Sequence, residues 1–302
     1  MTVFFPQGNI RRRGNVAYRD GYVKLPGRQL HYIDYGGMGE IVVALHGYVQ
    51  NAHAFDGIAP ALVPHLHLLA LDMRGRGGSD NGTAESYRIH RYLQDLQEFF
   101  DALELSRFAL IGTSMGGHLA LLYATAYPGK VTRLVLNDVV LDPDRTELIR
   151  LAGRFGQAPA RFVTIQEALA WFLEERGNLD HLDNEERLAW VSHFLVPAET
   201  GGYRFNCDPI LLDMMRQPRP NLGPKRMARQ QLVWEQAKRL KMPVLILRGA
   251  NSEAVSRENA RRMVEWLPAA RCVEVPGAGH SPTLYEPAVQ SALRDFFGIS
   301  AP

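Results

Sequence analysis

The sequence contains little cysteine and no long apolar run. Only Cys207 and Cys272 occur in 302 residues, too few for a disulfide framework, and they form no CxxC pattern for zinc or redox chemistry. No apolar run approaches the roughly 18 residues that a membrane span needs. We therefore expect a protein of a reducing, cytoplasmic compartment that has no membrane partner.

An excess of charge is also missing. The chain has 34 Lys and Arg against 32 Asp and Glu, so we expect no nucleic-acid partner. The dense basic run Arg11-Arg12-Arg13 is interpreted as part of a solvated N-terminal arm over residues 1–19, because no apolar targeting stretch follows it. Neither HExxH nor GxxxxGK[ST] occurs, so the sequence predicts no metal site and no nucleotide or other cofactor.

What the chain does contain is an alternation of short apolar runs with helical patterns. Strands buried on both faces are predicted at 40–47, 66–72, 107–112, 133–138, 242–249 and 271–277. Helices are predicted at 89–103, 115–127, 257–267 and 287–297. This alternation is typical of a mostly parallel sheet with helices on both faces. Residues 20–139 and 241–302 are therefore predicted to form one α/β core, with residues 21–37 as an antiparallel hairpin at one edge.

The alternation stops between residues 140 and 240, where helical stretches at 165–177 and 184–195 carry many aromatic residues. An insertion that leaves the sheet after one strand and returns before the next must lie over the carboxyl edge. Ligands bind at this edge in open α/β sheets. We therefore predict a helical cap over 140–240 that covers a partly apolar pocket for a small molecule.

A serine stands between glycines in IGTSMGGHLA, residues 111–120. The G-x-S-x-G pattern of Gly112, Ser114 and Gly116 is weak alone, but here it follows a predicted strand and precedes a predicted helix. A nucleophilic serine must sit on a tight, strained turn, so the residues two positions away must be small. Ser114 is therefore predicted to be a nucleophile; the alternative is an unreactive serine where a strand meets a helix.

A serine hydroxyl needs an adjacent base. His280, in VPGAGHSP, follows the last predicted strand and precedes the last helix, so it lies at the same sheet edge as Ser114. The glycines before it allow a loop that returns the imidazole to the serine. The histidines without such a context are interpreted as surface or packing residues: His31, His65, His67, His90, His181 and His193.

The third group must be a carboxylate that orients the histidine. Asp138 ends the predicted strand 133–138, and Glu253 follows the next strand, in RGANSEAVS. Both satisfy the order serine, acid, histidine. We favour Asp138 because a short side chain at the end of a strand is firmly placed, and we keep Glu253 as the alternative.

Acyl transfer also needs donors for the developing oxyanion. The residue after the nucleophile supplies one backbone N–H, that of Met115. The second donor is expected in the loop after the strand 40–47, which leaves the sheet at the same edge. The N–H of Tyr48 is the best placed there, whereas His46 and Gly47 are expected to shape the loop.

With these residues in view, the chain resembles the α/β-hydrolase family over about 20–138 and 240–298. The segments that carry the resemblance are LHGY, LDMRGRGGSD, GTSMGG and GAGHSP. The resemblance implies an eight-stranded, mostly parallel sheet with helices on both faces and a helical cap. It also implies Ser114 and His280 as nucleophile and base, and Tyr48 and Met115 as amide donors. On the DMRGRGGSD turn it implies structural roles for Asp72, Arg74, Arg76 and Ser79.

The chain departs from the family's pattern at one position. Members commonly carry the acid three residues after the glycine that ends the seventh strand, and counting from Gly249 this place holds Ser252. Some relatives carry the acid after the sixth strand instead, where this chain has Asp138. The resemblance therefore supports Asp138 and leaves Glu253 open.

The function predicted is that of a cofactor-independent, carboxylesterase-like serine hydrolase. It would cleave an ester, a lactone, an amide or an activated carbon–carbon bond through an acyl-enzyme. The alternatives are a ligand-binding or receptor protein on a hydrolase scaffold, and a cofactor-free oxygenase or peroxidase-like enzyme. Arginines of the cap that are either solvated or bind a substrate carboxylate are Arg154, Arg161 and Arg204.

Overall fold

Nine strands form one sheet in the computed structural model, which describes residues 10–13, 16–63, 65–139, 153, 156–176, 179–217, 232, 233 and 235–300. The strands are β1 (Arg11–Arg13), β2 (Val16–Leu25), β3 (Arg28–Gly36), β4 (Ile41–Leu45), β5 (His67–Leu71), β6 (Phe108–Thr113), β7 (Val131–Asn137), β10 (Val244–Gly249) and β11 (Ala270–Val275). Their order is β1-β2-β3-β5-β4-β6-β7-β10-β11. The last six strands in this order are parallel, and β1, β2 and β3 form an antiparallel meander against β5.

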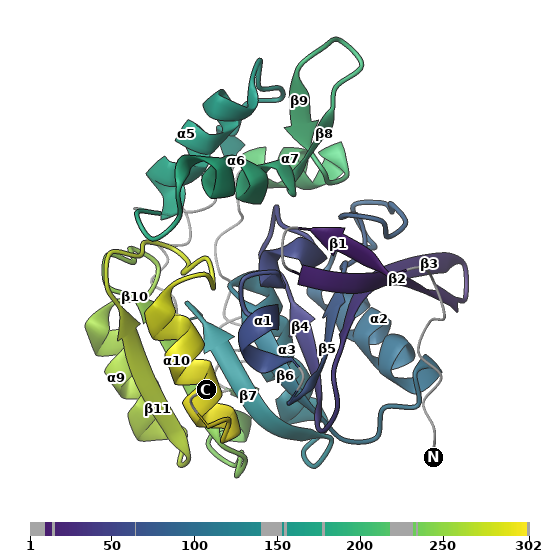
Figure 1. Ribbon diagram of the computed structural model, residues 1–302. Helices are drawn as coiled ribbons and strands as arrows, with labels where there is room; N and C mark the ends of the chain where they lie inside the picture. Colours follow the sequence, from purple (N-terminus) through teal and green to yellow (C-terminus); the bar gives the residue numbers. More distant parts are fainter. Residues whose placement is uncertain are drawn as a thin grey trace.

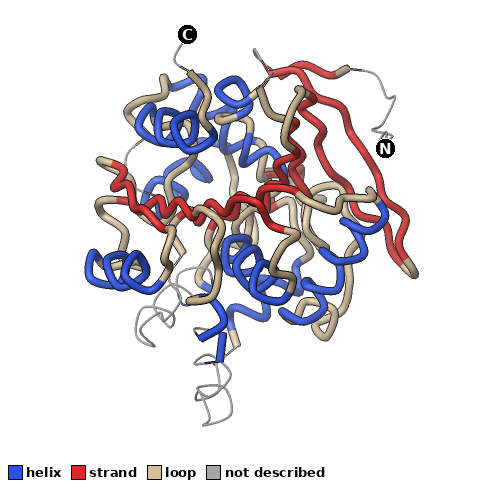
Figure 2. The backbone as a smooth tube through the Cα atoms, turned by 90° about the horizontal axis from the view of Figure 1, so that it is seen from below, coloured by secondary structure: helices blue, strands red, loops and turns tan. Residues whose placement is uncertain are grey.

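Helices cover both faces of this sheet (Figure 2). They are the 3-10 helix η1 (Ala52–Phe55), α1 (Ala59–Leu62), α2 (Ile89–Ala102), α3 (Met115–Ala126), α9 (Arg257–Trp266) and α10 (Pro287–Phe297). Helices α1 and α10 contact each other on one face, and α2 contacts α3 on the other. Because both faces are covered, every residue of β6 and of β10 is buried. The prediction of a mostly parallel sheet between two helical layers is confirmed.

The N-terminal residues differ from the expected solvated arm over residues 1–19. Arg11 to Arg13 form β1 and pair with Val16 to Tyr18, so the core sheet starts earlier than predicted and has nine strands rather than eight. Without β1, one edge of β2 would expose unpaired backbone groups. Arg11 and Arg12 are exposed, and such charged side chains protect an edge strand against pairing with a second chain.

The described part of the insertion lies apart from the sheet, above the carboxyl ends of the parallel strands (Figure 1). It contains α5 (Ile165–Arg176), α6 (Asn184–Ser192), a hairpin of β8 (Leu195–Pro197) and β9 (Tyr203–Phe205), and α7 (Pro209–Arg216). Phe162, Phe172, Trp190, Phe194 and Phe205 are almost fully buried and form its small core. The hairpin was not expected from the sequence. The limits of the cap at 140 and 240 stay a prediction.

The loops after β4 and β5 hold this cap against the core through hydrogen bonds. The backbone N–H of Asp208 donates to the carbonyl of Gly75, and Arg76 and Cys207 form an isolated β-bridge. The Tyr48 hydroxyl donates to the carbonyl of Leu211 on α7, at 2.8 Å. The cap therefore rests on the side of the sheet where β4 has β5 and β6 as neighbours. The chain order of the parallel strands reverses at this point, and such points are preferred ligand sites. None of the helices in the described residues is long and apolar enough to cross a membrane.

Candidate active site

Ser114 occupies a strained turn between β6 and α3. Its φ of 49° and ψ of −113° lie where residues with a side chain are rarely found, and its backbone N–H is held by the carbonyl of Asn137 at 2.9 Å. The strand thus ends and the helix begins within one residue. This turn leaves Ser114 partly exposed at the carboxyl edge, between a buried strand and a buried helix.

The glycines around Ser114 are required by close backbone approaches. A Cβ at Gly112 would lie 2.4 Å from the Cα of Gly117, and one at Gly116 would lie 2.1 Å from the carbonyl oxygen of Leu45. Both distances are far below van der Waals contact. The requirement for small residues two positions before and after the serine, inferred from the sequence, therefore has a direct steric cause.

Three side chains from separate loops form a chain of hydrogen bonds. Ser114 Oγ lies 3.0 Å from Nε2 of His280, and Nδ1 of His280 lies 2.5 Å from Oδ2 of Asp138. An ionised carboxylate only accepts hydrogen bonds, so Nδ1 carries the proton and Nε2 is left to accept from the serine hydroxyl. This is the tautomer that a histidine needs in order to act as a base toward serine.

Asp138 is fixed from several directions. It directly follows β7, has a left-handed φ of 54° and is 2% exposed. The backbone N–H of Gly249 donates to its Oδ1 at 3.0 Å, and the Ser252 hydroxyl donates to its Oδ2 at 2.6 Å. The carboxylate that faces His280 is therefore held by donors from the end of β10 and the loop after it.

The structure distinguishes between Asp138 and Glu253, the two candidates for the acid that contacts His280. Asp138 contacts His280, whereas the Glu253 side chain lies exposed in the turn before α9. Ser252, which occupies the position where an acid is common, is 8% exposed and faces Asp138. Nothing in the sequence pattern alone assigned a role to this serine.

Tyr48 and Met115, the expected oxyanion donors, are linked by a buried arginine. Nε of Arg76 donates to the carbonyl of Tyr48 at 3.0 Å, and its guanidinium lies 5.0 Å from the centre of the Tyr48 ring. Nη2 of Arg76 approaches Sδ of Met115 at 3.9 Å. Because Met115 is the first residue of α3, its N–H belongs to the helix-terminal donors that have no partner within the helix.

Arg76 is 1% exposed, and no carboxylate ion pair involves it in the described part of the chain. It also donates to the hydroxyl of Tyr92 and to the carbonyl of Arg74. Burial lowers the pKa of the guanidinium, but the contacts with Tyr92, Tyr48 and Cys207 outweigh burial and raise the pKa overall. A permanent positive charge therefore lies behind the loop that carries Tyr48. The sequence suggested only a structural role for Arg76.

The other residues of the DMRGRGGSD turn form hydrogen bonds that fix the turn and the chain after β4. The buried carboxylate of Asp72 accepts from the N–H groups of Ala52 at 2.6 Å and Gly78 at 2.8 Å, and it contacts Nδ1 of His31 at 2.7 Å. Burial alone would raise the pKa of Asp72, but the hydrogen bond and charge of His31 lower it. Ser79 donates to the carbonyl of Asp72, and Arg74 binds Asp95 on α2.

His46 is a buried neutral histidine directly before this loop. Its Nδ1 lies 2.7 Å from the carbonyl of Gly47, and its Nε2 accepts from the N–H of Met73 at 3.0 Å. Burial lowers its pKa to about 4. The uncharged ring therefore joins the ends of β4 and β5, in agreement with the role in shaping the loop that the sequence suggested.

Asn137 is a positioning residue that the sequence did not indicate. Its buried amide donates to Thr113 Oγ1 at 3.1 Å and to the carbonyl of Pro282 at 2.9 Å, so it joins the residue before Ser114 to the loop of His280.

Two of the three cap arginines considered as carboxylate ligands bind backbone carbonyls of the cap. Arg161 donates to the carbonyls of Thr200 and Gly201, and Arg204 donates to that of Phe205. Arg154 lies outside the described residues.

Comparison with known proteins agrees with this fold. Residues 40–287 match the family model of the alpha/beta hydrolase fold. The chain belongs to the α/β-hydrolase family. It is a hydrolase of this family, and relatives with similar sequences include proteins named as hydrolases and lipases.

Two relatives match this α/β hydrolase over most of its length. The 3-hydroxybutyrate-oligomer hydrolase of Cupriavidus necator is 30% identical over 263 residues, which cover 85% of this chain and 88% of the relative. A protein of Bacillus subtilis, named as a putative 2-succinyl-6-hydroxy-2,4-cyclohexadiene-1-carboxylate synthase, is 28% identical over 82% of this chain and 86% of its own.

A solved structure is similar over almost the whole chain. An alpha/beta hydrolase from Novosphingobium aromaticivorans has a TM-score of 0.77 and 29% identity to this α/β hydrolase, and the match covers 94% of this chain and 99% of the other.

Proposed function

We propose that this α/β hydrolase cleaves carboxylic esters through an acyl-enzyme on Ser114. The observation that carries the proposal is the hydrogen-bonded series of Ser114, His280 and Asp138 at the carboxyl edge of the sheet. A hydroxyl, an imidazole in the correct tautomer and a buried carboxylate are the groups that acyl transfer to serine requires. Ester hydrolysis is the simplest reaction that this set performs without a cofactor.

In the first half of the reaction, Ser114 Oγ attacks the ester carbonyl carbon while its proton moves to Nε2 of His280. The carbonyl oxygen becomes an oxyanion, which the N–H groups of Tyr48 and Met115 stabilise. The intermediate then breaks the bond to the leaving oxygen, which takes the proton from His280 and departs as an alcohol. Asp138 stabilises the imidazolium throughout without taking its proton.

In the second half, a water molecule takes the place of the alcohol. His280 accepts a proton from this water as its oxygen attacks the acyl carbon on Ser114. The second tetrahedral intermediate breaks the bond to Ser114 Oγ, and His280 returns the proton to the serine. A carboxylic acid leaves, and the free enzyme is restored.

The proposed substrate class is a short ester of a hydroxy acid. It is supported by the relative of 30% identity, which is named for 3-hydroxybutyrate oligomers, compounds that consist of hydroxy acids in ester linkage. The cap is expected to give the pocket a partly apolar ceiling, and the cap arginines Arg161 and Arg204 bind backbone carbonyls within the cap. We therefore expect contacts with the short, weakly polar acyl chain to determine which esters bind.

The first test compares wild type and Ser114→Ala on p-nitrophenyl esters of increasing acyl length and on the dimer and trimer of 3-hydroxybutyrate. The proposal predicts hydrolysis by the wild type, with an initial burst of p-nitrophenol, and loss of at least about 10³-fold in kcat in the variant. Ester hydrolysis that Ser114→Ala leaves unchanged would contradict the mechanism. Turnover that depends on dioxygen or peroxide would favour the oxygenase or peroxidase-like alternative, and tight binding without turnover would favour the receptor.

A further inference from the structure

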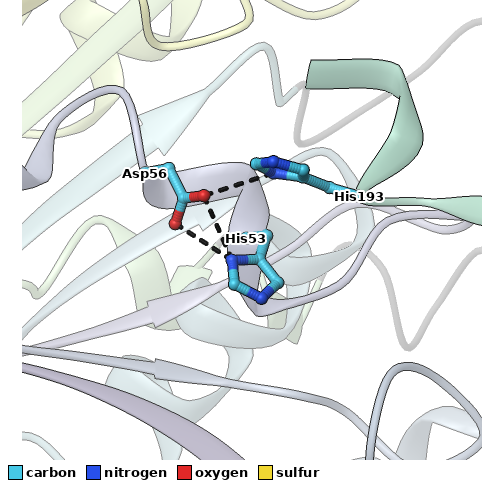
Figure 3. Close-up of side chains that lie close together, drawn as sticks. All are labelled: His53, Asp56 and His193. Carbon is cyan, nitrogen blue, oxygen red and sulfur yellow. Dashed lines mark hydrogen bonds and ion pairs between the residues drawn. The ribbon is translucent and has the colours of Figure 1, made fainter. Parts of the chain in front are cut away.

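Two histidines and an aspartate meet where the cap touches the core (Figure 3). His53 lies on η1, Asp56 follows directly after it, and His193 follows α6 of the cap. One donor atom from each of the three residues lies within 4.8 Å of the donor atoms of the other two. Figure 3 shows both imidazole rings directed at the Asp56 carboxylate.

The spacing of these donors is close to that of ligands around one ion. In the cluster, Asp56 Oδ2 lies 3.1 Å from Nδ1 of His53 and 3.2 Å from Nδ1 of His193. Donors around a tetrahedral zinc ion, with bonds of about 2.0–2.1 Å, are about 3.3 Å apart. The two distances to Asp56 are therefore close to the spacing of ligands around one zinc ion.

The Asp56 carboxylate is buried and held in one orientation. Its side chain is 4% exposed, as is that of His193, while the His53 side chain is 18% exposed and leaves a way in from solvent. The Tyr35 hydroxyl donates to Oδ1 at 2.5 Å, which orients the carboxylate.

Asn51 places the two histidines relative to each other. Its side-chain oxygen accepts from the backbone N–H of His53 at 3.1 Å, and its side-chain amide donates to the carbonyl of His193 at 2.6 Å. Asn51 is 2% exposed. One buried amide therefore fixes the backbone of both residues, one from the core and one from the cap, which reduces the cost of ordering a site between them.

We propose that His53, Asp56 and His193 bind one divalent transition-metal ion of the zinc class, with water at the remaining position. Two imidazole nitrogens and one carboxylate oxygen are ligands that zinc accepts, and the same set also suits other first-row metals. Since two ligands belong to the core and one to the cap, the ion holds the cap against the loop after β4. It is structural, and it takes no part in the ester reaction.

The test measures metal binding directly. The full chain is stripped with a chelator and titrated with Zn²⁺ by calorimetry, and we expect one ion per chain. His53→Gln and His193→Gln are expected to weaken binding by about 100-fold or more. Co²⁺ at the same site is expected to give the visible absorption of a tetrahedral nitrogen and oxygen environment. Zn²⁺ at 100 times its Kd is expected to raise the Tm of the wild type by about 5 °C.

Two control variants separate this site from other histidines. His67→Gln removes a histidine that pairs with Asp34 on the sheet, and it is expected to bind zinc as the wild type does. His280→Ala removes the imidazole next to Ser114, and it is expected to retain the same single ion. Loss of zinc binding in His280→Ala, with retention in His53→Gln, would place the ion at the reaction centre and overturn the proposal.

The result for the wild type decides the matter independently of any variant. If the stripped chain takes up no zinc, cobalt or nickel, the cluster is only a hydrogen-bonded contact between the cap and the core, and the proposal is wrong. Circular dichroism of each variant without metal checks that it is folded, and Asp56→Asn replaces any variant that is not. Ion uptake that all three ligand variants leave unchanged would also overturn the proposal.

Discussion

The hydroxyl of Ser252 donates a 2.6 Å hydrogen bond to the carboxylate of Asp138. Ser252 occupies the position at which members of the α/β-hydrolase family commonly carry the acid. In the proposed mechanism the acid comes from the end of β7, and the residue at the common position donates a hydrogen bond to it. The two positions are therefore neighbours around one imidazole, which explains how the acid can be supplied from either of them.

The first prediction concerns which acid orients His280. Asp138→Asn is expected to lower kcat by about 10⁴-fold with little change in KM, because an amide favours the wrong tautomer of the imidazole. Glu253→Gln, at an exposed position in the same region, serves as the matched control and is expected to stay within about twofold of the wild type. Steady-state kinetics on the best p-nitrophenyl ester measures both. Equal, modest losses from the two variants would refute the assignment.

The second prediction exchanges the two positions. In the double variant Asp138→Ser, Ser252→Asp, the carboxylate returns to the same neighbourhood from the loop after β10. We expect kcat to recover by at least about tenfold over Asp138→Ser alone, since Ser252 Oγ already lies next to the carboxylate that binds His280. Ser252→Asp alone, with two adjacent carboxylates, is the control and is expected to be less active than the wild type. No recovery in the double variant would mean that the loop cannot aim an acid at the ring.

The third prediction concerns the buried cation. Arg76→Met removes the donor to the carbonyl of Tyr48 and the charge behind it, so we expect kcat to fall by about 10-fold to 100-fold with a smaller change in KM. Arg257→Met, which alters an arginine whose side chain is 77% exposed, is the control. If Arg76→Met only lowers the Tm, and kcat per folded molecule is unchanged, Arg76 supports the fold alone.

The fourth prediction is a pH dependence of stability. His46 has a pKa of about 4 in the folded chain against 6.5 when unfolded, so below pH 6.5 the unfolded state binds more protons. The stabilisation from the neutral ring is complete above pH 6.5 and is lost as the pH falls from about 6.5 to about 4, by about 3 kcal/mol in all.

Urea unfolding of wild type and His46→Gln between pH 7.5 and pH 4.5 measures this effect. Gln can still accept from the N–H of Met73 but does not titrate, so the stability advantage of the wild type should shrink as the pH falls. A constant difference between the two proteins across this range would show that His46 is not the group that titrates. Comparison with the variant also removes the opposing contribution of His31, whose pKa is raised.

The sequence predicted those parts of the molecule that depend on local patterns. Around Ser114, short apolar runs alternate with helical patterns, and the pattern of small residues beside the serine is local in the sequence. The contact that requires Gly112 to be small lies within the same strand, turn and helix, whereas Gly116 must be small because of Leu45 on β4. His280 was recognisable because its loop joins the last strand to the last helix. All of this information lies within short segments of the chain.

The parts that the sequence left open depend on contacts between distant segments. Whether Asp138 or Glu253 faces His280 depends on how the loop after β10 folds, and Ser252 shows its role only once that loop is placed. β1 was missed because three arginines have no strand pattern of their own and are ordered by the free edge of β2. His53 and His193 are far apart in the chain, and no motif connects them.

Tyr48 links the loop after β4 to the cap. Its backbone lies in the loop beside Ser114, and its phenol reaches α7 of the cap through the carbonyl of Leu211. In the proposed mechanism, the position of the Tyr48 amide donor is therefore coupled to the position of α7. A substrate that displaced α7 would also displace this donor, so it would be discriminated in the rate of turnover rather than in binding.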